Sequence, residues 1–291
     1  MNKPYADRRW TSPDGLSLYA RDYAAADGPA KLPVIAIHGL TRNSADFETI
    51  APLIAQSGRR ILAVDVRGRG LSDRALDPMT YQPPNYAKDM LALMGAAGIE
   101  RAVFLGTSMG GLITMAMAAI KSKAVAAAII NDVGPEVAKE GLARIAAYAG
   151  QPVEVQSWAD ARDYVRRNNE IAFPARDDAF WDAFARRCFR VGTEGAPVLD
   201  YDPDISVPIL AAGTKALVPN LWPFFNRLAK GRPTLLIRGE TSDLLSPEIA
   251  TRMQKAARKM WFAEVPGVGH APMLDEPEAK AAVFEFLNQT P

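Results

Sequence analysis

A serine stands among glycines at the point where an apolar run ends. The stretch RAVFLGTSMGG (101–111) contains the spacing Gly106-x-Ser108-x-Gly110. Glycine at these two places removes side chains that would collide where a strand turns at once into a helix. The serine hydroxyl would then stand above the carboxyl ends of the strands, where open α/β sheets bind ligands. The spacing predicts a nucleophile, although a glycine-rich turn with an incidental serine has the same letters.

A serine hydroxyl needs a base to take its proton, and histidine is the usual one. The chain has only two histidines. His270 lies in VPGVGHAPMLDEP, a loop after the last predicted strand, so we expect it at the same sheet edge as Ser108. His38 ends the run LPVIAIHG. We expect His38 to shape that loop and to line the substrate site together with Gly39, and we predict His270 as the base.

The base histidine needs a carboxylate that fixes its tautomer and stabilises the imidazolium. Three acidic residues follow predicted strands in suitable places, namely Asp132, Glu240 and Asp243. We favour Asp243, because its strand should adjoin the one that leads to His270. Asp132 and then Glu240 stay as alternatives.

Acyl transfer passes through a tetrahedral oxyanion that backbone N–H groups can hold. Met109 follows the serine at the start of a predicted helix, where N–H groups lack partners and the dipole is positive. The second donor should come from the loop His38-Gly39-Leu40, where Gly39 lets the Leu40 amide turn toward the site. A plain strand-to-helix turn is the alternative reading of that loop.

The elements that must position these residues alternate along the chain. Residues 6–24 predict a hairpin around the turn Ser12-Pro13-Asp14-Gly15. Six short runs then predict strands, and amphipathic helical patterns separate most of them: LPVIAIHG, RRILAVD, RAVFLG, AVAAAIIND, PTLLIRG and MWFAEVPG. Most of these runs are apolar throughout, which is typical of parallel strands covered on both faces by helices. The chain therefore predicts an α/β fold.

The alternation of strands and helices is interrupted from about residue 134 to about residue 218. Three helical patterns rich in aromatic residues replace the strands there, and the stretch 195–208 looks like the return from them. We predict a core in two parts, 1–134 and 219–291, with a helical cap at 135–218.

The aromatic residues of the cap suggest a mainly apolar pocket. We expect Trp181 of the cap and Leu244, beside Asp243, to contact substrate. Packing within the cap is the alternative for Trp181, since aromatic residues at helical spacing more often form a core.

Together these motifs resemble the α/β-hydrolase family, in its capped esterase-like branch. The matching stretches are His38-Gly39-Leu40, DVRGRGLSD (65–73), GTSMGG (106–111), RGETSDLLS (238–246) and GVGHAPMLDEPE (267–278). They occur in the family's order and span nearly the whole core.

The resemblance implies an eight-stranded, mostly parallel sheet with a helical cap inserted after the sixth strand. It implies Ser108 as nucleophile, His270 as base, Asp243 as acid, Leu40 and Met109 as oxyanion donors, and neither a metal nor an organic cofactor. Relatives that dehalogenate or open epoxides use an aspartate at the serine's position, so the serine argues against both. The stretch 65–73 lacks the phosphate-loop spacing, and we expect Arg67 and Arg69 to be structural.

The bulk composition limits the partners and the compartment. With 34 basic and 33 acidic residues, a net charge of +1 gives no field that would attract nucleic acid or an anionic membrane. The one cysteine, Cys188, rules out an internal disulfide, which fits a reducing compartment. The N-terminal residues lack the apolar segment of a signal peptide, and no run approaches the roughly 20 apolar residues of a membrane span. We expect a cytoplasmic monomer or homodimer with a small-molecule ester as its substrate.

The leading function is hydrolysis of carboxylic esters of small to medium apolar substrates through an acyl-enzyme. The alternatives are carbon–carbon bond hydrolysis of a dienone acid, lactonase or perhydrolase activity, and ligand binding without turnover. A substrate that bears a carboxylate would favour an arginine in the pocket. Arg186, Arg187 and Arg190 are candidates for that contact, with a solvated helix face as the alternative.

Overall fold

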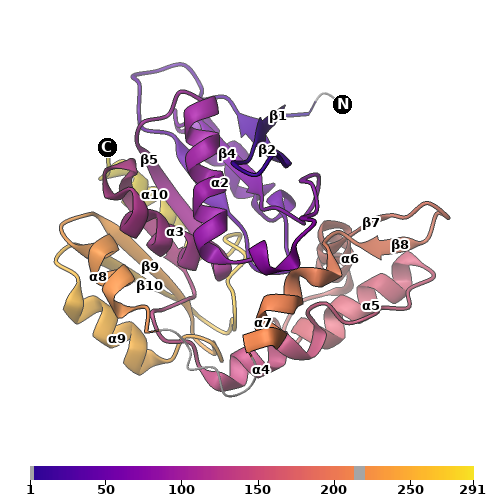
Figure 1. Cartoon of the computed structure of the whole chain (residues 1–291). Coiled ribbons are helices and arrows are strands. Elements are labelled where there is room, and N and C mark those ends of the chain that lie inside the picture. Colours follow the sequence, from indigo (N-terminus) through magenta and orange to yellow (C-terminus); the bar gives the residue numbers. More distant parts are fainter. Residues whose placement is uncertain (1–2, 213–219) are drawn as a thin grey trace.

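A single large sheet lies at the centre of the computed structural model, which describes residues 3–212 and 220–291 (Figure 1). Its strands follow the order β1 (Ala6–Thr11), β2 (Ser17–Tyr23), β4 (Ile61–Asp65), β3 (Val34–Ile37), β5 (Ala102–Thr107), β6 (Val125–Asn131), β9 (Thr234–Gly239) and β10 (Met260–Val265). β2 pairs antiparallel with β1 and β4, and the other neighbours pair in parallel. The predicted α/β architecture is confirmed, and the hairpin expected at 6–24 forms one edge of the sheet.

The central strands are apolar throughout because both of their faces are covered. In β3, Ile35 and Ile37 pack into the core of one face, while Val34 and Ala36 pack into the core of the other. Side chains alternate between the two faces along a strand, so a strand with two buried faces has no polar position to show.

Helices of the core supply the two covers. One face packs against α2 (Pro83–Ala96), α3 (Met109–Ile120), α8 (Trp222–Ala229) and α9 (Pro247–Ala256). The opposite face packs against α1 (Ile50–Gln56) and α10 (Pro277–Asn288). Short 3-10 helices complete the connections at η1 (Ser44–Phe47), η2 (Pro78–Thr80), η3 (Ser122–Ala124) and η4 (Pro203–Ser206). No helix in these two ranges has both the length and the apolar character to cross a bilayer.

The segment that runs from the end of β6 through α7 leaves the sheet and forms the cap, which Figure 1 shows beyond the carboxyl edge of the strands. It contains α4 (Lys139–Tyr148), α5 (Trp158–Asn169), α6 (Asp178–Cys188), the hairpin β7 (Phe189–Val191) and β8 (Pro197–Leu199), and α7 (Val207–Ala212). The insertion follows the sixth strand of the chain. The boundary predicted at residue 218 lies outside the described residues.

The β7–β8 hairpin corrects the expectation of a purely helical cap. The turn closes with Gly192 N–H donating to Ala196 O at 2.8 Å and Gly195 N–H donating to Gly192 O at 3.1 Å. Each strand has only three residues, which is too short for an alternating pattern to stand out in the sequence.

Candidate active site

The serine lies on a one-residue corner between β5 and α3. Ser108 has φ +52° and ψ −116°, a backbone conformation that residues other than glycine rarely adopt. A Cβ on Gly106 would overlap the Gly110 carbonyl, and a Cβ on Gly110 would overlap the Ile37 carbonyl. The two glycines therefore allow α3 to cross close to β5 and β3, and the corner presents the serine hydroxyl at the carboxyl edge of the sheet.

His270 lies within hydrogen-bond distance of Ser108. Its Nε2 lies 2.9 Å from Ser108 Oγ, and the ring is mostly buried. The loop that carries His270 is held from both sides, since Gly269 N–H donates to Ala172 O of the cap at 2.8 Å and Gly267 N–H donates to Glu240 Oε2 at 2.7 Å. Glu240, the least favoured acid candidate, thus helps to hold the histidine loop.

The carboxylate on the far side of the imidazole belongs to Asp132. Its Oδ2 lies 2.8 Å from His270 Nδ1 and also accepts from Ser242 Oγ at 2.7 Å, while its Oδ1 accepts from Gly239 N–H at 3.0 Å. Asp132 is fully buried. A carboxylate that accepts these bonds places the imidazole proton on Nδ1, which leaves Nε2 free to accept the Ser108 proton.

Asp243 does not reach His270, and the prediction that it does is corrected to Asp132. β9 adjoins β10 as expected, but the loop after β10 turns back across β9 to reach Ser108 at the end of β5. The imidazole therefore meets the end of β6, the strand next to β5, where Asp132 lies.

Asp243 instead joins the core to the cap. Arg144 of α4 donates to its carboxylate from Nε at 2.6 Å and from Nη2 at 2.9 Å. Burial raises the pKa of Asp243, but the hydrogen bonds and charge of Arg144 outweigh it, so the pKa lies below its usual value. The neighbouring Ser242 turns its hydroxyl inward to Asp132, while Asp243 turns outward.

Asn131 is a positioning residue that the sequence analysis missed. Its Nδ2 donates to Thr107 Oγ1 at 3.1 Å and to Pro272 O at 2.8 Å, so it joins the end of β5 to the histidine loop. The side chain is fully buried. A polar residue that ends an otherwise apolar strand is the signal that could have marked it.

Two backbone N–H groups are available beside Ser108. Within residues 3–212 and 220–291, neither Leu40 N–H nor Met109 N–H donates to a protein acceptor. Met109 opens α3, where the first N–H groups have no partner inside the helix. Leu40 lines the same cavity as Ser108, and Met109 follows Ser108 in the chain.

His38 orients the peptide that carries one of these donors. Its Nε2 accepts from Val66 N–H at 3.0 Å, so Nδ1 holds the proton and donates to Gly39 O at 2.7 Å. This bond fixes the Gly39 carbonyl toward His38, and the Leu40 N–H of the same trans peptide points the opposite way. Burial lowers the pKa of His38 to about 3, so the ring stays neutral.

The two arginines of the stretch 65–73 are structural, as expected. Arg69 Nε donates to Leu40 O at 3.0 Å and holds the other side of the same loop. Arg67 forms ion pairs with Asp89 at 2.6 Å and with Asp14 at 2.7 Å.

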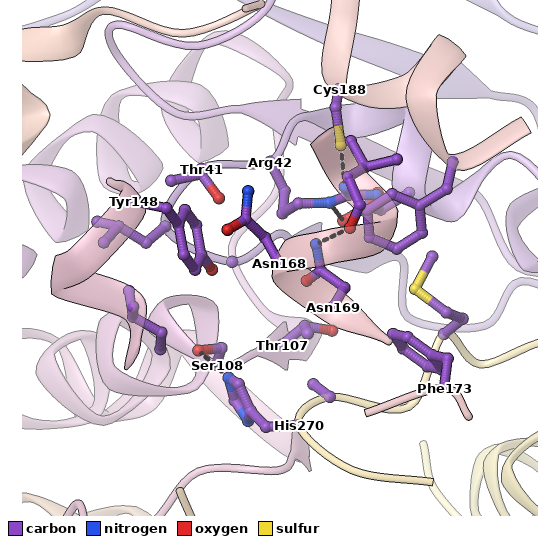
Figure 2. A pocket seen from close by; sticks show the side chains of 18 of the residues that line it. Thr41, Arg42, Thr107, Ser108, Tyr148, Asn168, Asn169, Phe173, Cys188 and His270 are labelled. Atoms are coloured by element: carbon purple, nitrogen blue, oxygen red, sulfur yellow. Dashed lines mark hydrogen bonds and ion pairs between the residues drawn. The ribbon is translucent and has the colours of Figure 1, made fainter. Parts of the chain in front are cut away.

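A cavity lies between the sheet edge and the cap. Figure 2 shows Ser108 and His270 on one side of it and Arg42 with Cys188 on the other. Its apolar lining comes largely from Phe47, Ile145, Val165, Phe173, Phe184, Leu199, Met273 and Leu274. Its polar lining includes Thr41, Arg42, Asp46, Tyr148, Asn168 and Asn169.

Of the four residues expected to contact substrate, only Gly39 lines this cavity. His38 is fully buried behind the loop. Trp181 is 1% exposed and packs against Phe173, Phe180 and Phe184 at ring-centroid distances of 5.0–6.4 Å, so it belongs to the cap's own core. Leu244 is buried beneath α4, against Gly141. The expectations for His38, Trp181 and Leu244 are therefore corrected.

Arg42 and Asp46 are pocket residues that the sequence analysis missed. Their spacing of four places an opposite-charge pair at the start of a helical segment, a pattern that usually marks a solvated helix face. Among the described residues, no group of three or more His, Cys, Asp or Glu side chains is arranged to hold a metal ion.

Comparisons with known proteins identify the family to which the fold belongs. The model of the alpha/beta hydrolase family matches residues 34–283, most of the chain. The chain belongs to the alpha/beta hydrolase family. A solved alpha/beta hydrolase from Novosphingobium aromaticivorans is 42% identical, with a TM-score of 0.93 and full coverage of both chains.

Two named hydrolases are also similar to this chain along most of their length. The 3-hydroxybutyrate-oligomer hydrolase of Cupriavidus necator is 33% identical over 283 residues, 95% of this chain and 94% of that protein. The 2-(acetamidomethylene)succinate hydrolase of Mesorhizobium japonicum is 28% identical over 238 residues, 80% of this chain and 79% of that protein.

Proposed function

We propose that this protein is a serine hydrolase that cleaves carboxylic esters through an acyl-enzyme. The observation that carries the proposal is the continuous chain from Ser108 Oγ to His270 Nε2 at 2.9 Å and from His270 Nδ1 to Asp132 Oδ2 at 2.8 Å. This is the arrangement in which a base activates a serine and a carboxylate orients the base. The similarity to a 3-hydroxybutyrate-oligomer hydrolase supports an ester as the substrate.

The geometry supports a two-step reaction. His270 takes the Ser108 proton as the oxygen attacks the ester carbonyl, and the Leu40 and Met109 N–H groups hold the oxyanion. His270 then gives the proton to the leaving alcohol, which departs and leaves the acyl group on Ser108. A water that the same histidine deprotonates attacks the acyl-enzyme, and the acid leaves as Ser108 recovers its proton. Asp132 keeps the proton on Nδ1 and stabilises the imidazolium in both steps.

The cavity wall favours substrates with an apolar portion. Apolar side chains from the core and the cap form most of its wall. Burying an alkyl chain there contributes about 0.8 kcal/mol per methylene group, so we expect kcat/KM to rise with chain length until the cavity is filled.

The first test is steady-state hydrolysis of p-nitrophenyl esters from acetate to dodecanoate by the wild type and by Ser108→Ala. We expect many turnovers in the wild type and a fall of about 10⁴–10⁶-fold in kcat for the variant. Ser57→Ala, which changes a serine at the end of α1 and outside the cavity, serves as the matched control and should keep full activity.

Two results would contradict the proposal. Activity retained by folded Ser108→Ala would exclude the serine as nucleophile. Release of a single equivalent of product without further turnover would indicate a binding protein rather than an enzyme. In the expected case, the chain length that gives the highest kcat/KM measures the acyl side of the cavity.

A further inference from the structure

A guanidinium lies inside the cavity, away from the reacting groups. Arg42 lines the cavity with 13% of its side chain exposed, and Figure 2 shows it across the pocket from Ser108 and His270. It pairs with Asp46 and bonds the Cys188 thiol, and it stacks on the Phe184 ring with 4.0 Å between the guanidinium carbon and the ring centroid. We call Arg42, Asp46 and Cys188 the Arg42 cluster.

The cluster leaves part of the guanidinium unused. Arginine has five N–H donors in a planar fork. Asp46 takes the edge formed by Nε and Nη2, and Cys188 takes one donor of Nη1. One N–H on each terminal nitrogen therefore has no protein acceptor among the described residues. Free N–H groups of a guanidinium are strong donors to a carboxylate.

The charges around the cluster are balanced in pairs, so no net negative charge there would repel an anion. Arg42 offsets the Asp46 charge, and the Arg187 guanidinium, 7% exposed, lowers the pKa of Asp46 further although it also pairs with Glu48 at 3.4 Å. Arg187 Nε is buried and has no partner in the described part of the chain. Burial raises the pKa of Cys188 to about 11, so its thiol stays neutral and adds no negative charge.

An ion pair that served only to stabilise the fold would not need to lie in the cavity wall, where Arg42 and Asp46 lie. Arg67 and Asp89 show what a structural pair looks like in this protein, since their side chains are 2% and 0% exposed and lie outside the cavity. Arg42 and Asp46 are each 13% exposed, and both line the cavity beside the amide groups of Asn168 and Asn169. A largely desolvated guanidinium in a cavity with a mainly apolar wall is most useful to a substrate with an anionic end.

We infer that the Arg42 end of the cavity binds a free carboxylate carried by the ester, so that the protein selects acidic esters over neutral esters of equal length. The inference rests on the proposed esterase function and adds the class of substrate. Arg42 would hold the remote carboxylate while the scissile carbonyl lies at Ser108. Hydroxy-acid esters and half-esters of dicarboxylic acids belong to this class.

The experiment compares each acidic ester with its neutral carboxamide counterpart. One arm places the carboxylate on the acyl side, with mono-p-nitrophenyl glutarate against the p-nitrophenyl ester of glutaric monoamide. The other arm places it on the alcohol side, with 3-butyryloxybutyrate against 3-butyryloxybutyramide. The ratio of kcat/KM within each pair does not depend on the fraction of folded enzyme, so a poorly folded variant still gives an interpretable ratio.

We expect the wild type to prefer the acid by about 10- to 100-fold in at least one arm, mainly through KM, because a hydrogen bond to a charged group contributes about 1.5–3 kcal/mol. Arg42→Met should remove this preference. The double variant Arg42→Met/Asp46→Leu should remove it as well, without leaving Asp46 unpaired. Arg186→Met, which removes a positive charge from the exposed side of α6, should keep the preference.

Two outcomes would overturn the inference while leaving the esterase proposal standing: equal kcat/KM within both pairs, or a preference that survives in Arg42→Met. Failure of the esterase proposal has a different signature, namely absence of turnover on every ester, p-nitrophenyl butyrate included. In that case calorimetric titration with glutarate and with glutaric monoamide tests the carboxylate site directly. Equal affinity for the two would refute it.

Discussion

The corners after β6 and after β9 each place an aspartate at the carboxyl edge of the sheet, yet the two carboxylates have different partners. Asp132 is fully buried and accepts three hydrogen bonds, one of them from His270. Asp243 is 28% exposed and pairs with Arg144 of the cap. The contrast shows that an aspartate on the strand adjacent to the histidine's own strand need not be the one that bonds the histidine. The path of the histidine loop decides which aspartate does.

The two corners are nevertheless connected. Ser242 belongs to the loop after β9, but its hydroxyl donates to Asp132 at 2.7 Å. The same oxygen accepts from Leu245 N–H at 3.1 Å. One loop therefore supports the buried carboxylate through Ser242 and docks the cap through Asp243.

The strongest test of the comparison exchanges each aspartate for asparagine. Asp132→Asn should lower kcat by about 10⁴-fold, because an amide can no longer hold the imidazole proton on Nδ1. Asp243→Asn, the matched isosteric change, should lower kcat by less than about tenfold. Steady-state kinetics on p-nitrophenyl butyrate measures both, with circular dichroism as the check on folding. The comparison breaks if the two variants lose equal activity, or if Asp243→Asn loses more.

A smaller effect is expected from the residue that the two corners share. Ser242→Ala removes one of three hydrogen bonds to Asp132 and should lower kcat by about three- to tenfold, in keeping with about 0.5–1.5 kcal/mol per bond. Ser246→Ala is the matched control, since Ser246 lies four residues further on and caps α9. It should cost about 1 kcal/mol of stability and leave kcat unchanged. An unchanged kcat in Ser242→Ala would mean that the β9 corner takes no part in catalysis.

The smallest expected effect belongs to the pair that links the cap to the core. A double-mutant cycle of Arg144→Met and Asp243→Ala, measured by urea unfolding, should give a coupling free energy of about 1 kcal/mol or less. Because Arg144 holds the pKa of Asp243 below its usual value, the carboxylate is ionised at pH 7 and at pH 5. The coupling should therefore be equal at these two pH values and fade only as the pH falls through the lowered pKa. A coupling that already fades by pH 5 would contradict this assignment.

Much of the fold followed from local patterns. Apolar runs without polar alternation indicated buried parallel strands, and the glycines around Ser108 indicated a strand-to-helix corner whose close contacts the structure shows. These signals act over a few residues, where steric overlap and burial leave few choices. The β7–β8 hairpin escaped prediction because its three-residue strands are shorter than one clear alternation.

The contacts that the candidate site residues make with each other depend on the tertiary structure. His270 and Asp132 are separated by 138 positions, and Arg42 and Cys188 by 146. Such contacts depend on the path of a loop across the sheet and on the position in which the cap packs against the sheet edge. Spacing along the chain indicated the corner at Ser108, one candidate base and three candidate acids. The folded chain selected Asp132 among them and placed Arg42 in the cavity, because hydrogen bonds and ion pairs need distances near 3 Å that spacing along the chain does not specify.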